Sequence, residues 1–302
     1  MTCSRAPVAR GASAGEAGAG AEPVVEAASA PRPDPGAGGV QSLLGVEFTD
    51  RGFDALTDEI LANDGADAAC RLVVTANVDH IVKLQHNRDL RQAYDFAWRA
   101  TVDGAPLQWV AFLAGSTVPH RITGADLFVA VVDRLDPARH RPAFVASDEA
   151  LAQTVREWLE SRAFPADSVS VCVPPFGFES DDAASEELLQ AVARCRPTHV
   201  FFGVGAPKSE IFAFRHRERF RGAIVMCIGA AIGFRFGTLR RAPSLARRFG
   251  FEWLWRLLSE PKRLFRRYLI ESVPFCRVAA AEITRGWQAR LAAFVGSMRT
   301  RG

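Results

Sequence analysis

Five short runs of apolar and β-branched residues, separated by longer amphipathic stretches, constrain the fold of this chain more than any other feature. The runs cover residues 72–75, 143–146, 169–173, 199–204 and 223–228. Their apolar residues are consecutive rather than alternating, which is typical of strands buried on both faces of a parallel sheet. The alternation with helical stretches therefore predicts an α/β fold, a Rossmann-like parallel sheet flanked by helices.

Two of the stretches between the runs carry clear helical signals. Residues 148–160 keep Leu151, Val155 and Leu159 on one face, and Ser147 is well placed as the N-cap, with acidic residues in the first turn. Residues 186–195 repeat the pattern before a proline ends it. In folds of this kind, ligands gather where strands give way to loops at their carboxyl ends, so polar residues at these exits are candidates for function.

The ends of the chain differ in composition from its middle. Residues 1–40 consist mainly of Ala, Gly, Pro and Glu, without an aromatic residue, and are expected to be disordered. They do not resemble a secretory signal, because Glu and Gly interrupt the apolar stretch, and no later segment has the roughly 18 uncharged apolar residues of a membrane span. We therefore expect a disordered segment at 1–40, an α/β core at 41–245 and a basic, aromatic C-terminal appendage at 246–302.

The six cysteines stand singly in the sequence, without the spacing of a metal site, and most of them lie in apolar runs. We interpret them as reduced core residues of a cytosolic protein. The sequence thus predicts neither a metal site nor a cofactor.

Positive charge is concentrated in the last part of the chain. From residue 235 onward there are fifteen Lys and Arg and four Glu, a charge of +11, so with the whole chain at +3 the first 234 residues sum to −8. Within this tail Arg256, Arg263 and Arg266 are spaced by seven and three residues, roughly one helical face, among aromatic side chains. Such a tail indicates an anionic membrane surface, a phosphorylated ligand or nucleic acid as partner; a solvated charged face, or a helix packed on the body, remains the alternative.

Polar residues stand at the ends of two strands in the first half of the chain. Thr75 and Asn77 end the first run, where they could cap the following helix or hold a sugar or phosphate. Asp103 and Gly104 follow a further short strand, and an Asp-Gly pair forms either a turn or part of a catalytic centre.

Two later loops combine cations with glycines. Arg121 precedes a Thr-Gly turn and a helix, where its guanidinium could meet a phosphate or be a simple surface group. Gly203 and Gly205 would let a ligand approach the backbone, and Lys208 and Glu210 open a helix whose N-terminus favours an anion. The loop lacks the Walker pattern and the third glycine of a dinucleotide fingerprint.

In this order the motifs resemble the WecG/TagA/CpsF family of bacterial glycosyltransferases. The matching segments are TANVDHIVKL, the DG of TVDGAPL, RITGADL, GVGAPKSE, the RAP of LRRAP, and FEWLWRLLSEPKRLFRRYL. Singly these motifs are weak, but the ordered set is specific and spans residues 42–270.

The resemblance implies a peripheral enzyme on the cytoplasmic face of the cell membrane. Such an enzyme moves a sugar, commonly an N-acetylmannosamine derivative, from a UDP donor to a polyprenyl-diphosphate-linked acceptor, in the synthesis of a cell-surface polysaccharide or teichoic-acid-type glycan. The reaction inverts the anomeric centre and is not known to need a metal. The absence of any Asp-x-Asp triplet from the sequence agrees with that.

The resemblance also implies roles for individual residues. Asp103 would be the catalytic base, Thr75 and Asn77 would shape the pocket beside it, and Arg121 would assist the phosphates or the acceptor. Three arginines of the tail would complete the active site and meet the membrane or the lipid diphosphate: Arg256, Arg263 and Arg266. One carboxylate suffices for an inverting transfer, and the cations and glycine loop would neutralise the departing diphosphate.

The sequence departs from the family pattern in three places. The usual PKQE is PKSE, with Ser209 in place of Gln. A Phe-Asp pair is replaced by Ile232 and Gly233, which removes a carboxylate, and a glycine pair is replaced by Ser147 and Asp148. These changes fall where the donor is expected to bind, so they bear on the identity of the donor more than on the reaction class.

Two other classes of function were weighed against this interpretation. A Rossmann-like oxidoreductase could bind NAD at GVGAPK, but the third glycine and the ribose-binding acid are missing. A nucleic-acid-binding protein could use the basic tail, but stacking aromatics are sparse and no binding motif is visible, so we expect no nucleic acid partner. The sequence leaves open whether the chain forms a homo-oligomer.

Overall fold

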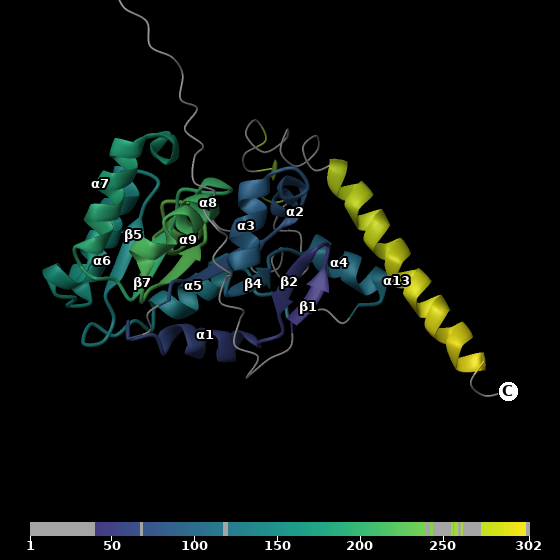
Figure 1. Cartoon of the computed structure of the whole chain (residues 1–302). Helices are drawn as coiled ribbons and strands as arrows, with labels where there is room; N and C mark the ends of the chain where they lie inside the picture. Colours follow the sequence, from purple (N-terminus) through teal and green to yellow (C-terminus); the bar gives the residue numbers. More distant parts are fainter. Residues whose placement is uncertain are drawn as a thin grey trace, which may run out of the picture. The chain divides into compact units, whose positions relative to one another are not determined.

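The computed structural model describes residues 40–66, 69–116, 120–239, 242–243, 255, 257–258, 261 and 273–299 (Figure 1). These residues all belong to the second of the chain's two compact units, which spans Arg32–Gly302. The segment 1–39, the expected boundary at residues 245 and 246, and the tail residues Arg256, Arg263 and Arg266 lie outside the described residues.

A six-stranded parallel sheet forms the centre of the described fold. Its strands, in order across the sheet, are β4 (Arg99–Val102), β3 (Arg71–Ala76), β8 (Ile224–Cys227), β7 (His199–Phe202), β5 (Pro142–Val145) and β6 (Ser170–Cys172). All five predicted runs are strands of this sheet, which confirms the predicted fold class.

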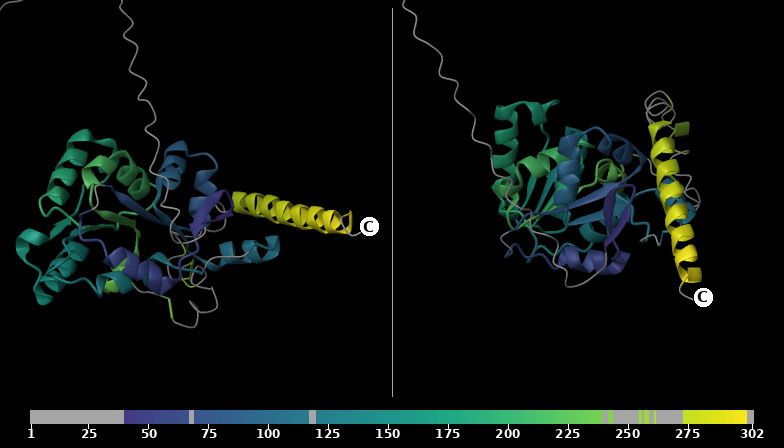
Figure 2. Two further views of the ribbon diagram at one scale, coloured as in Figure 1. Left: turned by 60° about the horizontal axis from the view of Figure 1, so that its bottom comes forward. Right: turned by 45° about the vertical axis from the view of Figure 1, so that its right-hand side comes forward.

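Helices cover both faces of the sheet (Figures 1 and 2). One face packs against α1 (Phe53–Leu61), α5 (Gly124–Val132), α6 (Glu149–Ser161) and α9 (Ala231–Arg235). The other packs against α2 (Val78–Leu84), α3 (Arg88–Phe96), α4 (Ala105–Ala114), α7 (Asp182–Ala193) and α8 (Lys208–Arg215). Short 3-10 helices occur at Ala166–Ser168, Phe178–Ser180 and Arg217–Phe220.

Alternate residues of each central strand enter the two cores. Along β3, Leu72 and Val74 face the α2–α8 side, whereas Val73 faces the α1–α5 side. Apolar residues are needed at every position of such a strand, which explains the continuous runs. The run at 169–173 is the exception, because β6 lies at the edge of the sheet and all three of its residues are half-buried. The expectation that it would be buried on both faces was therefore wrong.

Two helix starts differ from the sequence-based expectation. Asp148 caps α6 by accepting a hydrogen bond from the backbone N–H of Leu151, while Ser147 donates its hydroxyl to the Asp148 carboxylate. Helix α7 begins at Asp182, four residues earlier than expected, because the Asp181 carboxylate accepts from two backbone N–H groups of the first turn. Carboxylates are among the strongest N-caps, so here they take precedence over the neighbouring hydroxyl and over the apolar pattern.

An antiparallel hairpin precedes the sheet and was not predicted. It joins β1 (Val40–Leu43) to β2 (Val46–Thr49) through Leu44 and Gly45, which both have positive φ. The two strands, VQSL and VEFT, lack the consecutive apolar residues by which the strands of the sheet were recognised. Phe48 of β2 is fully buried in the core on the α2–α8 side, so the hairpin belongs to the body of the domain.

The last described element, α13 (Val273–Arg299), packs on α4, as both views of Figure 2 show. Trp287 Nε1 donates to the backbone carbonyl of Leu113 at 2.9 Å. A Cβ at Gly286 would lie 2.1 Å from the carbonyl oxygen of Ala114, so the two backbones touch at a position that only glycine permits. Within the described residues, no helix has the length and apolar character needed to cross a membrane.

The expectation of free cysteines is confirmed for the described residues, but the expectation that they lie in the core is confirmed for only some of them. All five described cysteines are free, and three of them, Cys70, Cys195 and Cys227, are buried. Cys172 is half-buried and Cys276 is exposed, so these two are not core residues.

Candidate active site

Neighbouring strands are followed by helices on opposite faces at four places in the sheet, and two of these places lie beside the candidate motifs. Strands β5 and β7 are neighbours, but the helices that follow them, α6 and α8, lie on opposite faces of the sheet. The same holds for β3 and β8, which are followed by α2 and α9. A crevice opens at the carboxyl ends of strands where the direction of connection changes, and this is the usual ligand site of open α/β sheets.

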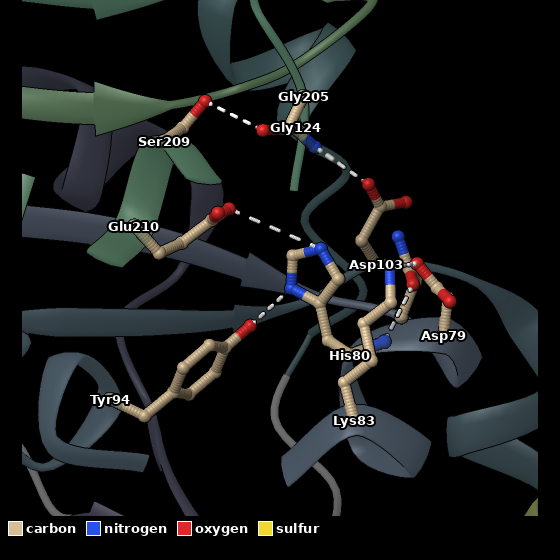
Figure 3. Close-up of polar contacts among 10 residues, drawn as sticks. Asp79, His80, Lys83, Tyr94, Asp103, Gly124, Gly205, Ser209 and Glu210 are labelled. Carbon is tan, nitrogen blue, oxygen red and sulfur yellow. Dashed lines mark hydrogen bonds and ion pairs between the residues drawn. The ribbon is translucent and has the colours of Figure 1, made fainter. Parts of the chain in front are cut away.

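Asp103 is held at the carboxyl end of β4 by its neighbours. Its backbone N–H donates to the carbonyl of Ala76 at 2.8 Å, and its carboxylate accepts from the backbone N–H of Gly124 at 3.4 Å. Arg121 pairs with Val102 in an isolated parallel bridge, so the Arg121–Gly124 loop runs beside Asp103. The backbone thus fixes the carboxylate at the edge of the sheet, where it remains partly accessible (Figure 3).

Thr75 lies beneath the same loop. It is buried near the end of β3, and a Cβ at Gly124 would stand 3.0 Å from its hydroxyl oxygen. The predicted residues Thr75, Asp103 and Arg121 are therefore brought together around Gly124, although they come from three separate segments of the sequence.

Asn77 and Gly104 have clear structural roles at the same edge. The Asn77 side chain accepts from the backbone N–H of His80 at 3.2 Å, which makes it the N-cap of α2, one of the two alternatives that the sequence left open. Gly104 precedes α4 with φ of 112°, a conformation that side chains other than hydrogen rarely allow. The Asp-Gly pair therefore forms the bend that places Asp103 just before the N-terminus of α4.

The glycine loop lies at the β5–β7 crevice. The backbone N–H of Gly203 donates to the carbonyl of Val145 at 2.8 Å, and a Cβ there would collide with Ile232 at 2.9 Å. Gly205 has φ of 87° and open space where its Cβ would be. The first glycine is thus required by packing, and the second leaves the backbone open to a ligand, as the GVGAPK motif suggested.

A cation and an aromatic ring stand together beyond this loop. Lys208 opens α8, and its ammonium lies 5.5 Å from the centre of the Phe176 ring and 5.8 Å from that of Phe178. Phe178 is buried, but Phe176 is fully exposed in the loop after β6. Phe176 was missed in the sequence; the signal was an aromatic residue between Pro-Pro and Gly at the exit of a strand, where solvent exposure has no packing explanation.

Glu210 lies in the interior rather than on the surface of the crevice. Its side chain is buried, and Oε1 lies 4.0 Å from Nε2 of His80, which is itself 2.5 Å through Nδ1 from the hydroxyl of Tyr94 (Figure 3). Burial raises the pKa of Glu210 to about 7. The structure places Glu210 behind the glycine loop, among α2, α3 and α8.

Two of the three departures from the family pattern have a local explanation. Ser209 donates its hydroxyl to the carbonyl of Gly205 at 2.9 Å, so its side chain closes the turn of the glycine loop. At Gly233 a Cβ would lie 2.9 Å from Leu239 Cδ1 and 3.0 Å from Thr238 Oγ1. The place of the missing carboxylate is therefore occupied by Leu239 and Thr238.

Arg121 also borders a pocket of about 670 Å³ between α1 and α5, together with Phe53, His120 and Asp126. Asp103 and the glycine loop are not among the residues that line it. We therefore take the strand ends, where the polar groups converge, as the candidate site rather than this wider hollow.

Comparison with known proteins confirms the resemblance found in the motifs. The sequence profile of the Glycosyl transferase WecG/TagA/CpsF family matches residues 41–289. The N-acetylglucosaminyldiphosphoundecaprenol N-acetyl-beta-D-mannosaminyltransferase of Bacillus spizizenii is 30% identical over 203 residues, 67% of this chain and 75% of the relative. The protein of the same name from Staphylococcus aureus (strain MW2) is 22% identical over 250 residues, 80% of this chain and 92% of the relative. With a match over most of its length, the chain belongs to the WecG/TagA/CpsF family of glycosyl transferases.

Proposed function

We propose that the chain transfers N-acetylmannosamine, or a closely related hexose derivative, from a UDP-linked donor to N-acetylglucosamine carried on a polyprenyl diphosphate. The sugar and the acceptor follow from the activity for which both relatives are named. The observation that carries the proposal is Asp103, a carboxylate held by backbone contacts beside Thr75 and Arg121 at the carboxyl end of β4.

In this reaction Asp103 is the general base. The acceptor hydroxyl oxygen attacks the anomeric carbon of the donor, its proton passes to the Asp103 carboxylate, and the bond from the anomeric carbon to the diphosphate oxygen breaks. One displacement from the opposite face inverts the anomeric centre, which one carboxylate can serve, whereas a retaining enzyme requires a second as nucleophile.

The leaving diphosphate requires positive charge where it departs. Lys208 and the first turn of α8 stand at the glycine loop, and Arg121 stands across the edge beside Asp103. Cations and helix N-termini can stabilise a diphosphate without a metal ion, and the sequence contains no Asp-x-Asp triplet to hold one. We therefore propose a metal-independent transfer, with the Phe176 ring available to stack on the donor base.

We also propose that the enzyme works as a peripheral protein on the inner face of the membrane. The enzyme has to reach a lipid-linked acceptor at the surface of a bilayer. Helices α4 and α13, which contact each other, expose apolar side chains that suit such a surface, and Phe112 of α4 is 80% exposed. The exposed apolar residues are Trp109, Phe112 and Leu113 of α4 and Trp287, Leu291 and Phe294 of α13. Arg285 and Arg290 lie on the same stretch of α13, and apolar and cationic groups together favour an anionic interface.

The test is an assay of the purified full-length protein. UDP-N-acetylmannosamine, UDP-N-acetylglucosamine and UDP-glucose are each offered with a water-soluble, short-chain analogue of the diphosphate-linked acceptor. We expect turnover to be fastest with UDP-N-acetylmannosamine and NMR of the product to show the opposite anomeric configuration to the donor. Retention of configuration, or turnover with none of these donors, would contradict the proposal.

The tail arginines can be tested in the same assay. We expect the triple variant Arg256→Gln, Arg263→Gln, Arg266→Gln to bind phosphatidylglycerol vesicles more weakly, because each basic residue near an anionic surface contributes about 1 kcal/mol. Slow transfer to the soluble acceptor as well would place these arginines in the active site. Unchanged vesicle binding and unchanged transfer would show that these arginines act neither in membrane binding nor in the active site.

A further inference from the structure

The first turns of α2 and α8 meet in the interior through one pair of side chains. His80 is the third residue of α2 and Glu210 the third residue of α8, and their side chains face each other 4.0 Å apart (Figure 3). Each helix begins directly after a loop of the candidate site: α2 after Thr75–Asn77, and α8 after the glycine loop. The pair therefore stands behind the two loops and spans the distance between them.

The surroundings of Glu210 do not suit a charged carboxylate. Both helices and the sheet bury it completely, and its Oε2 has no hydrogen-bond partner among the described residues. The charged and titratable groups facing it are Asp79 and Lys83, paired with each other on α2, together with His80, Tyr94 of α3 and Cys227 of β8. An isolated buried charge is expensive, whereas a neutral carboxyl is tolerated.

His80 is itself held in place. Its Nδ1 is 2.5 Å from the hydroxyl of Tyr94, and burial keeps the pKa of Tyr94 well above its usual value. The Asn77 side chain caps the His80 backbone N–H. Tyr94 thus holds the His80 ring, and Asn77 holds the His80 backbone at the start of α2.

We propose that Glu210, in its neutral form, is a positioning residue that acts through His80 to set the spacing between the Thr75–Asn77 strand end and the glycine loop. This inference rests on the proposed function, because the spacing matters only if base and diphosphate act from opposite sides of one crevice. A displacement of about 1 Å in such a site can cost a hundredfold in rate.

Ionisation of Glu210 would disturb the spacing. A buried carboxylate has to recruit water or a counter-charge, because its Oε2 has no hydrogen-bond partner among the described residues. Burial raises the pKa of Glu210 to about 7, so the charge appears as the pH rises through neutrality. We therefore expect kcat to fall on the alkaline side of pH 7, with the donor KM changing little.

The experiment compares Glu210→Gln with Glu210→Ala in the soluble-acceptor assay from pH 6 to pH 9. Gln is neutral and nearly isosteric, so we expect it to remove the alkaline fall in kcat; Ala leaves a void, so we expect kcat about tenfold lower at every pH. Ser185→Ala is the control, since it also removes a buried polar group from the first turn of a helix, but on α7. If Glu210→Gln keeps the alkaline fall, or lies below the parent at every pH as loss of an ion pair would require, the proposal is wrong.

Two further measurements separate this proposal from the proposed function. We expect Tyr94→Phe combined with Glu210→Ala to lower kcat by less than the product of the single effects, because both act through His80; independent effects would overturn the proposal. The second measurement, the free energy of unfolding, needs no substrate. With a folded pKa near 7 and an ordinary value of 4.5, the stability from neutral Glu210 is complete below about pH 4.5 and is lost as the pH rises to about 7. Glu210→Gln should remove this slope, and an unchanged slope would refute the neutral form even if no donor gave turnover.

Discussion

At the β3–β4 end of the sheet's carboxyl edge, polar groups are held by backbone contacts and partly withdrawn from solvent. Asp103 accepts from a backbone N–H, and Thr75 is covered by Gly124. At the β5–β7 end, by contrast, the exposed Phe176 ring and the half-buried Lys208 lie beside a glycine loop with open space in front of Gly205. The first region offers one fixed carboxylate, and the second offers charge and area to a large ligand.

The difference leads us to expect a division of labour along the carboxyl edge of the sheet. Rate depends on geometry that is fixed before the substrate arrives, so changes at the β3–β4 end should lower kcat. Affinity for the donor depends on contacts made in both the ground and the transition state, so changes at the β5–β7 end should raise KM. Steady-state kinetics of variants at the two ends can test whether kcat and KM respond separately in this way.

The largest effect is expected from Asp103→Asn. The amide keeps the shape of the carboxylate but cannot accept the proton, so kcat should fall about 100-fold or more while the donor KM stays nearly constant. Asp167→Asn, an exposed carboxylate on a 3-10 helix away from the crevice, is the control. Near-normal turnover of Asp103→Asn would show that Asp103 is not the general base.

Gly124→Ala tests whether the β3–β4 end is as closely packed as it looks. The added methyl would stand 3.0 Å from the Thr75 hydroxyl and push the loop away from Asp103, so we expect kcat to fall about tenfold. Gly52→Ala is the matched control, because a Cβ there meets nothing within 4 Å. Equal kinetics for the two variants would show that this end is not pre-organised.

Lys208→Gln addresses the other end. Removing the ammonium should raise the donor KM about tenfold, the size expected for one charge-assisted hydrogen bond to a phosphate, and should leave the acceptor KM unchanged. Titration of UDP by calorimetry measures the same loss without turnover. A fall in kcat with a constant donor KM would place Lys208 in the chemical step instead.

Phe176→Ala should have a smaller effect in the same direction. Loss of an exposed ring that stacks on the donor base is expected to raise the donor KM about fivefold, and Phe176→Tyr should restore most of the affinity. If neither variant changes donor binding, the ring has a different purpose, and the exposed loop after β6 is not part of the donor site.

No effect is expected from chelation. If cations and backbone groups neutralise the leaving diphosphate, initial rates in about 5 mM EDTA should equal those in buffer alone. A loss of activity that manganese or magnesium restores would show that both ends of the edge act around a metal ion.

The sequence was informative where a residue's environment is set by its neighbours in the chain. Strands buried on both faces require consecutive apolar residues, so the five runs and the sheet were predictable, and Asn77 caps a helix that begins at the next residue. Because parallel strands end at one edge, Thr75, Asp103 and the glycine loop could be expected to gather there.

Features that depend on contacts between distant segments of the chain could not be predicted from the sequence. The edge position of β6 depends on strand order, and strand order is fixed by packing between segments far apart in the chain. Glu210 looked like a ligand-binding residue at a helix start, but the facing first turn of α2 encloses it. Phe176 escaped notice because a single aromatic residue carries no periodicity.

The crowded surroundings of Gly233 have a consequence for engineering. A Cβ added there would lie within about 3.0 Å of side-chain atoms of Leu239 and Thr238, so these neighbours have to shift before a larger residue fits. A single substitution at Gly233 would therefore change the local packing as well as the chemistry, and a carboxylate is best introduced together with a smaller residue at Leu239.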